Sequence, residues 1–329
     1  MMIKKRKFFR GAIAGAAFLV LILDSPLALE GARAGMELCI RTVVPSLFPF
    51  FVLSMVVTEN LSSGTFRPVT ALGTVLGISE GAAPVLIPAM LGGYPVGAKC
   101  VGDLCQSNQI SKEEAERLLA FCSNAGPSFL FGMVSGCFPE QNTVWLLWLV
   151  HLSGAFLTAA VIPKVKEETR KYTQKNDAES KPILLSAARA MFLVCCWVIL
   201  FRIVLTFLEQ WFLWLLPDWV QVLSMGFLEL TNGICGLSQI ADVEIRFLLC
   251  ACMLSFGGLC VVFQTASVIG DLPLGCYLKG KCLQTLFSFL LSCSLVTEFG
   301  LLFTVLALFL VLIFRKLQNS YGNPKLLPV

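Results

Sequence analysis

Charged side chains are scarce in this chain. Asp, Glu, Lys and Arg make up only 14% of its 329 residues, whereas hydrophobic residues make up 57%. Soluble domains carry about 25% charged residues, so the composition excludes an ordinary soluble domain. The net charge of +4 is small, and its clustering in loops indicates membrane topology rather than nucleic-acid binding. We therefore expect a single polytopic membrane domain.

Histidine is the second scarcity, because the chain contains only one. This excludes a His-rich metal site. The sequence also lacks a Gly-x-Ser-x-Gly elbow, a phosphate-binding Gly-x-x-x-x-Gly-Lys-Ser/Thr loop and a His-Glu-x-x-His motif. The 14 cysteines lie mostly inside apolar runs, where they serve as small polarizable packing residues. We expect neither an enzyme nor a bound cofactor or metal.

Hydropathy predicts an all-α polytopic membrane protein with about eight transmembrane helices plus two re-entrant hairpins. Each half contains a short hairpin with a Gly-rich break and then a span broken by glycine. The two halves therefore look similar, although the sequence leaves parallel and inverted repeats both open. The predicted spans are 9–29, 39–57, 111–138, 142–162, 183–208, 247–269, 282–297 and 300–314, and the hairpins are 69–94 and 219–239.

The distribution of basic residues predicts the topology. Lys and Arg cluster at the N-terminus, between residues 164 and 181, and at Arg315-Lys316, and such clusters favour the cytoplasm. We expect a first membrane half at 1–163, a cytoplasmic linker at 164–182 and a second half at 183–329.

The segment from Leu91 to Lys99 is the most informative. It follows an apolar run, 82–91, that is too short to cross a bilayer, and it contains three glycines and Pro95. Backbone broken at membrane depth survives only where protein or water surrounds it, and broken helices hold the substrate in many transporters. Lys99 either meets an anionic substrate or extends to the membrane surface.

Polar residues inside apolar segments are the other candidates. Glu229 could bind a cation or a proton, or cap a broken helix. For Arg41 and Arg202, extension to the surface is favoured, and for His151 a bond to a neighbouring helix. The predicted substrate-binding residues are Gly93, Tyr94, Pro95, Gly97, Lys99, Asn124, Gly126, Ser128, Glu229, Thr231, Asn232, Gly233, Ser255, Gly257 and Gln264.

Five segments carry a resemblance to a known family: 41–50 (RTVVPSLFPF), 93–98 (GYPVGA), 124–129 (NAGPSF), 229–233 (ELTNG) and 255–258 (SFGG). They resemble the sporulation integral membrane proteins of endospore-forming bacteria, which carry the nucleoside-recognition (Gate) domain. The resemblance covers residues 39 to 297. It implies a transporter that moves dipicolinic acid across the outer forespore membrane, in which case the protein lies in that membrane or in the cell membrane.

Three alternatives for function stay open at this stage. The chain could instead transport nucleosides or another metabolite, or it could organise a sporulation complex without transporting anything. The expected partners are a small organic anion, membrane lipid and a coupling proton or cation, with no nucleic acid and no assigned oligomeric state. Half-helix N-termini suit a dianion such as dipicolinate, whereas Glu229 would repel it.

Overall fold

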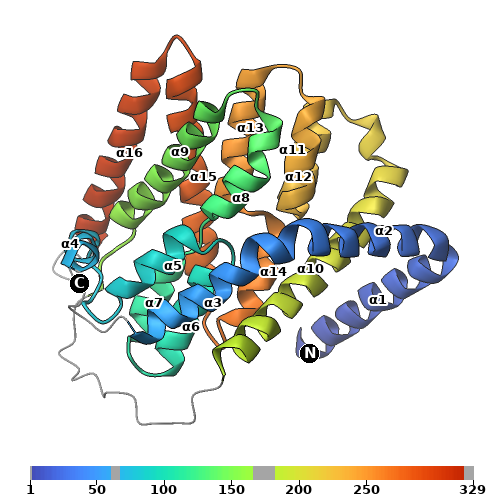
Figure 1. Cartoon of the computed structure of the whole chain (residues 1–329), viewed down its shortest axis with the longest axis horizontal. Helices are drawn as coiled ribbons and strands as arrows, with labels where there is room; N and C mark the ends of the chain where they lie inside the picture. The colour runs from blue at the N-terminus through green and yellow to red at the C-terminus, as the bar shows by residue number, and fades with distance from the viewer. Residues whose placement is uncertain (1, 61–66, 166–181, 322–329) are drawn as a thin grey trace.

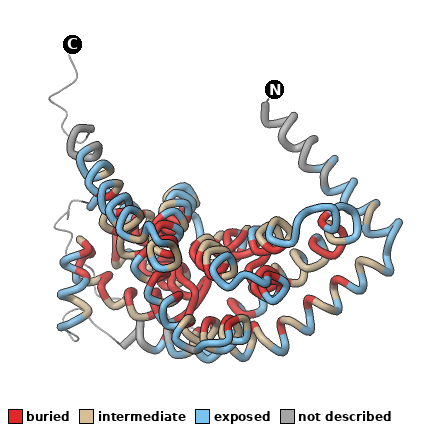
Figure 2. The backbone as a smooth tube through the Cα atoms, turned by 90° about the horizontal axis from the view of Figure 1, so that it is seen from above, coloured by how far each residue is buried: buried red, intermediate tan, exposed pale blue. Residues whose placement is uncertain are grey.

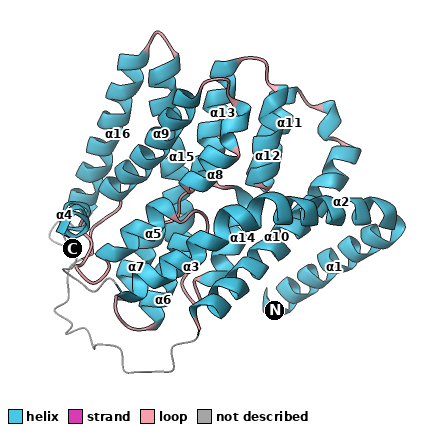
Figure 3. Ribbon diagram, viewed as in Figure 1, coloured by secondary structure: helices cyan, strands magenta, loops and turns pink. Residues whose placement is uncertain are grey.

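The computed structural model describes residues 2–60, 67–165 and 182–321. Within these ranges the chain forms α-helices and short helical turns and contains no strand (Figure 3), which confirms the predicted all-helical class. The linker 166–181 lies outside the described residues, so its predicted place in the cytoplasm stays a prediction, as does the division into two halves.

The helices of the first part are joined mostly by short turns (Figure 1). They are α1 (Met2–Leu23), α2 (Ser25–Leu38), α3 (Val44–Asn60), α4 (Arg67–Leu76), α5 (Leu86–Leu91), α6 (Val96–Gln106), α7 (Lys112–Leu119), α8 (Pro127–Gly132) and α9 (Gln141–Val161). The predicted start of α7 is confirmed, since the Ser111 hydroxyl accepts a bond from Glu114 N at 3.1 Å and so satisfies a free N–H of the first turn.

The second part contains longer helices. They are α10 (Ile183–Trp211), α11 (Asp218–Leu228), α12 (Leu230–Gly236), α13 (Val243–Phe256), α14 (Gly258–Val268), α15 (Gly275–Val296) and α16 (Gly300–Tyr321). Helix α15 packs between α9 and α13, and α10 lies along α2 (Figure 1).

Four helical segments of the described chain are long and apolar enough to cross a membrane: Ser25–Leu53, Asn142–Val161, Ile183–Trp211 and Val243–Val268. The last three confirm predicted spans, whereas the total of eight crossings stays a prediction. Buried residues concentrate in the middle of the molecule, and α1 and α16 are exposed along most of their described length (Figure 2). Most of their exposed side chains, such as Phe18 and Leu301, are apolar, as lipid contact requires.

The predicted first span, 9–29, is wrong because the chain turns at Asp24. Helix α1 ends at Leu23, and Asp24 caps α2 by accepting a bond from Leu27 N at 3.2 Å. Helix α2 then continues through one π-helical turn, Cys39–Val43, into α3. This irregular turn ends two residues before Pro45, which has no N–H to donate and so disrupts the regular helical hydrogen bonds there.

The predicted start of the span 282–297 is also wrong. Helix α15 begins at Gly275, so Lys281 lies inside this helix and not before it. Lys281 is also fully buried, with 0% of its surface exposed. A hydropathy scale places a lysine outside the membrane, but in this fold Lys281 has buried polar partners. A charge inside a membrane protein is tolerated where such partners surround it.

Four chain breaks bring the two parts together. They separate α5 from α6 at 92–95, α7 from α8 at 120–126, α11 from α12 at Glu229, and α13 from α14 at Gly257. Gly93 and Gly257 have φ angles of +79° and +84°, which L side chains rarely adopt.

Close packing of glycine holds these breaks against one another. A methyl group added at Gly126 would lie 2.8 Å from Gly93 N, so the break after α7 touches the break after α5. A methyl group added at Gly233 would lie 2.2 Å from Gly226 Cα, so α11 and α12 also meet backbone to backbone. In the first part of the chain a short helical hairpin, α5–α6, precedes a broken helix, α7–α8. In the second part the hairpin α11–α12 precedes the broken helix α13–α14.

Candidate functional site

A buried polar stripe on α15 forms the centre of the molecule. Lys281, Gln284 and Ser288 are each 0% exposed, and their spacing of three and four residues places them on one face of the helix. This face contacts Tyr94 and the break between α7 and α8.

The Lys281 ammonium has neutral partners. Its Nζ donates to Gln284 Oε1 at 2.7 Å, to Tyr94 OH at 3.1 Å and to the Ser123 carbonyl, and it lies 4.8 Å from the centre of the Tyr94 ring. Three acceptors match the three donors of an ammonium group, and a ring face attracts a cation. The charge is therefore solvated by dipoles in place of a carboxylate.

Gln284 and Asn124 extend this network to the first part of the chain. Gln284 Nε2 donates to Asn124 Oδ1 at 2.8 Å and to the His151 carbonyl at 3.2 Å. Asn124 Nδ2 donates to Phe121 O at 2.8 Å and to Ala89 O at 3.2 Å. Asn124 therefore ties the unwound segment after α7 to helix α5 and to α15 at once.

His151 closes the network on the other side. Its Nε2 accepts a bond from Ala125 N at 3.0 Å, and its Nδ1 lies 3.3 Å from Ser255 Oγ. Ser255 donates to Ser288 Oγ at 2.7 Å, so we assign the proton of the imidazole to Nδ1. A neutral His151 thus bonds across several helices, which agrees with the role favoured for it on sequence.

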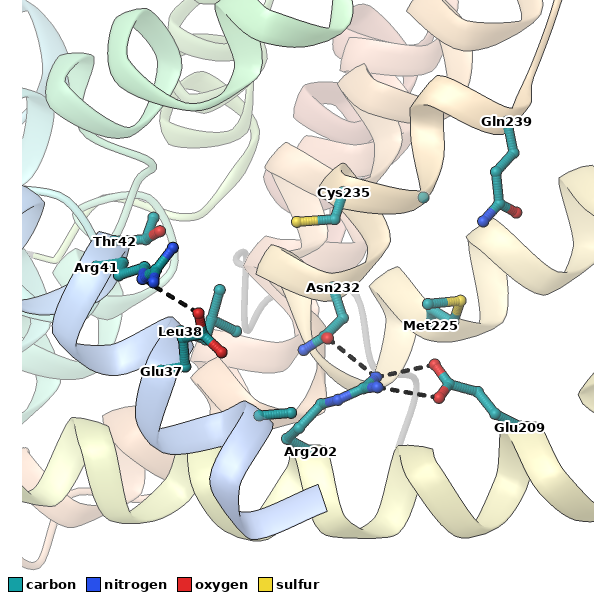
Figure 4. Close-up of a pocket in the computed structure, with 12 residues that line it drawn as sticks. Glu37, Leu38, Arg41, Thr42, Arg202, Glu209, Met225, Asn232, Cys235 and Gln239 are labelled. Carbon is teal, nitrogen blue, oxygen red and sulfur yellow. Dashed lines mark hydrogen bonds and ion pairs between the residues drawn. The ribbon is translucent and has the colours of Figure 1, made fainter. Parts of the chain in front are cut away.

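The second polar centre is a cavity of about 430 Å³, shown in Figure 4. Its lining residues come from α2, from the π-helical turn and from α10, α11 and α12, and Gln239 comes from the short turn after α12. They are Ala34, Glu37, Leu38, Arg41, Thr42, Arg202, Glu209, Met225, Asn232, Cys235, Gly236 and Gln239.

An ion-pair network forms one wall of this cavity. Arg202 Nη1 and Nη2 donate to Glu209 Oε1 and Oε2 at 2.9 and 3.1 Å, and Nη1 also donates to Asn232 Oδ1 at 3.1 Å. Glu229 Oε2 accepts from Asn232 N at 2.8 Å and from Asn232 Nδ2 at 2.6 Å. Glu229 therefore caps α12, which was one of the roles predicted for it. It also fixes the Asn232 side chain, whose oxygen accepts the bond from Arg202.

The break at Gly257 lies between the two centres. A methyl group added at Gly257 would lie 3.3 Å from Tyr94 Cζ, and one added at Gly258 would lie 2.8 Å from Gly226 O. Tyr94 OH also donates to Leu254 O at 2.8 Å. The unwound segment between α13 and α14 therefore contacts the first hairpin on one side and the second hairpin on the other.

The structure brings most of the predicted site residues together, in two groups. The first group surrounds Tyr94 and Asn124, and the second surrounds Glu229, next to Asn232 in the cavity lining. The first contains Gly93, Tyr94, Pro95, Gly97, Asn124, Gly126, Ser255 and Gly257, and the second contains Glu229, Thr231, Asn232 and Gly233. Their role in binding substrate stays a prediction.

Three predicted residues have separate partners. Lys99 pairs with Asp103 at 2.7 Å one turn along α6. Ser128 donates to Ser46 O at 2.8 Å and so joins α8 to α3. Gln264 donates to Cys260 Sγ at 3.1 Å within α14. In this conformation the charge of Lys99 is matched by a neighbouring carboxylate.

Sequence reasoning missed Lys281, Gln284 and Ser288, and it assigned Arg202 to the membrane surface. The Arg202 side chain is only 19% exposed and points to Glu209 and Asn232, so that assignment is wrong.

A signal for the α15 residues was present in the sequence. Lys281, Gln284, Ser288 and Ser292 repeat at intervals of three, four and four residues, which predicts a polar helix face inside an apolar segment.

The apolar helices and the buried polar centre define a class: a multi-pass, all-helical integral membrane protein. In an alignment of 303 positions that covers 76% of this chain and 72% of the relative, the chain is 26% identical to the sporulation integral membrane protein YlbJ of Bacillus subtilis (strain 168). No protein-family model matches the chain, and no solved structure matches it. The resemblance to the Gate domain therefore stays a prediction.

Proposed function

We propose that the protein is a sporulation membrane transporter that moves a small organic anion, dipicolinic acid, across the outer forespore membrane. Its similarity to a sporulation integral membrane protein supports the cellular setting. The observation that carries the chemistry is Lys281, a fully buried cation with neutral partners, placed where the chain breaks meet.

The buried cation favours an anionic substrate for an electrostatic reason. An ammonium group inside a membrane protein costs several kcal/mol unless it is paired or well solvated. An arriving carboxylate gives Lys281 a full opposite charge in surroundings of low dielectric, where the attraction is strong. A small organic acid therefore gains more from Lys281 than a neutral nucleoside does.

The chain breaks supply the movement that such a substrate needs. Tyr94 lies in the break between α5 and α6 and bonds to Leu254 of α13 and to Lys281 of α15. When a substrate carboxylate takes the place of Tyr94 OH at Lys281, one of the two hydrogen bonds of the Tyr94 hydroxyl is lost and the hairpin is held less firmly. In this proposal the hairpin then opens, and Glu229 carries the coupling proton or cation.

Uptake into proteoliposomes tests the proposal. The purified protein should concentrate labelled dipicolinate, excess unlabelled dipicolinate should compete, and nucleosides should not. Lys281→Met should lower uptake at least about tenfold, as the loss of one charged hydrogen bond predicts. Lys279→Met is the matched control, because Lys279 is exposed on the same helix. Uptake no higher than in empty liposomes would overturn the proposal, and competition by nucleosides would favour the alternative substrate.

A further inference from the structure

We infer that the cavity beside α10 is a carboxylate-binding site in which Arg202 is the receptor and Glu209 occupies the place of the ligand. This inference rests on the proposed function and adds a second binding site for the same organic acid. Tyr94 of the α15 network contacts Gly257, whereas α11 contacts Gly258, and neither Tyr94 nor Lys281 lines the cavity, so the two cations are separate.

The geometry of the Arg202–Glu209 pair is that of carboxylate recognition. Two nearly parallel bonds of 2.9 and 3.1 Å join the two terminal nitrogens of the guanidinium to the two carboxylate oxygens. This bidentate arrangement is the one that arginine offers to any planar carboxylate. A ligand carboxylate can therefore replace that of Glu209 with no change in the position of Arg202.

The two partners differ in how firmly they are held. Arg202 is fixed by a further bond to Asn232, which Glu229 holds through two bonds. Glu209 has Arg202 as its ion-pair partner, its side chain is 32% exposed, and it lies two residues from the end of α10 at Trp211. Glu209 is therefore the group that leaves, and Arg202 is the group that stays.

The opposite wall contains a second arginine. Arg41 Nε lies 3.1 Å from Glu37 Oε1, and both side chains are exposed, while Figure 4 shows this pair across the cavity from Arg202. A cavity of about 430 Å³ has room for a small aromatic acid. A ligand with two carboxylates can pair with Arg202 at one end and, by displacing Glu37, with Arg41 at the other, whereas a monocarboxylate uses only one of the two arginines.

The inference predicts opposite effects of two conservative changes. Glu209→Gln removes the competing carboxylate and should tighten binding about tenfold. Arg202→Lys keeps the charge but loses the planar fork, and it should weaken binding about tenfold or more, the loss of roughly one charged hydrogen bond. Glu298→Gln and Arg189→Lys are matched controls, because both residues are exposed and lie away from the cavity.

The affinity is measured by calorimetric titration of the purified protein with pyridine-2,6-dicarboxylate. Pyridine-2-carboxylate measures the contribution of the second carboxylate, and thermal denaturation of each variant checks that it is folded. Tighter binding by Glu209→Gln and weaker binding by Arg202→Lys, with unchanged controls, supports the site. If both variants are folded and bind like the wild type, the site does not exist.

The same variants separate this inference from the proposed function. Wild-type protein that transports dipicolinate, with Glu209→Gln and Arg202→Lys unchanged in binding, refutes the cavity site and leaves the transporter proposal standing. Binding that responds to both changes in a protein that gives no uptake supports the cavity site and refutes transport. Binding of the monocarboxylate as tight as that of the dicarboxylate would refute the part played by Arg41.

Discussion

Gly97 offers the most direct test of how the first hairpin packs. A methyl group added there would lie 1.9 Å from the carbonyl oxygen of Cys122 and 2.8 Å from Ala89 Cα. Real carbon–oxygen contacts of this kind exceed about 3 Å, and both neighbours are backbone, so a helix must shift by roughly 1 Å. We expect Gly97→Ala to destabilise the protein by about 3 kcal/mol, the upper end of ordinary overpacking.

Two other glycines make this prediction quantitative. At Gly102 the added methyl would lie 3.0 Å from Ile269 Cα, and at Gly132 it would meet nothing within 4 Å. The destabilisation should therefore fall in the order Gly97→Ala, Gly102→Ala, Gly132→Ala. The last variant should match or slightly exceed the wild type, because alanine favours a helix over glycine by about 1 kcal/mol.

Thermal denaturation of the three purified variants in detergent measures the order. A loss of about 3 kcal/mol corresponds to a midpoint lowered by roughly 5 °C or more. Uptake of dipicolinate by Gly97→Ala should fall as well, because the shift separates the hairpin from the break that contains Asn124. A Gly97→Ala protein as stable as Gly132→Ala would show that α6 does not pack against the Cys122 carbonyl, and the reasoning would fail.

Three further predictions concern charge. Glu229→Gln keeps one oxygen that can accept both bonds from Asn232, so it should leave binding of dipicolinate intact but abolish its accumulation against a gradient; full accumulation by this variant would exclude a coupling role. Arg117→Met should destabilise the fold by about 3 kcal/mol in chemical denaturation, because the carbonyls of Leu76, Gly77 and Ala159 lose a buried donor. A cysteine at Thr173, in a protein otherwise free of cysteine, should react with an impermeant thiol reagent only after permeabilisation; labelling of intact cells would reverse the topology.

Local signals in the sequence predict much of the helical architecture. Long apolar runs predict the ends of α9 to within one residue and those of α10 to within three, because a helix in lipid must satisfy its own backbone groups over a fixed length. The Ser111 cap and the Asn124–Pro127 break are also visible, since each depends on side chains next to one another in the chain. The turn at Asp24 escapes hydropathy because apolar residues continue on both sides of it.

The polar centres could be predicted only in part, because they depend on contacts between distant segments. Asn124 and Glu229 stand out as polar groups beside breaks in apolar sequence. Lys281 directly precedes the apolar run 282–297, and hydropathy reads a lysine there as the end of a span. Its burial depends on Tyr94 and Ser123, which are 187 and 158 residues away along the chain. No window of local sequence contains that information.

The buried cations differ in a way that bears on function. Arg117 is held by three backbone carbonyls at the ends of α4 and α9, groups that cannot turn away while those helices persist. Lys281 is held by the Ser123 carbonyl and by two side chains, Tyr94 and Gln284, and a side chain can rotate. Arg117 therefore has the partners of a permanent helix cap, whereas Lys281 has partners that an arriving anion can replace. This contrast is the physical reason to assign the substrate to Lys281 rather than to the other buried cation.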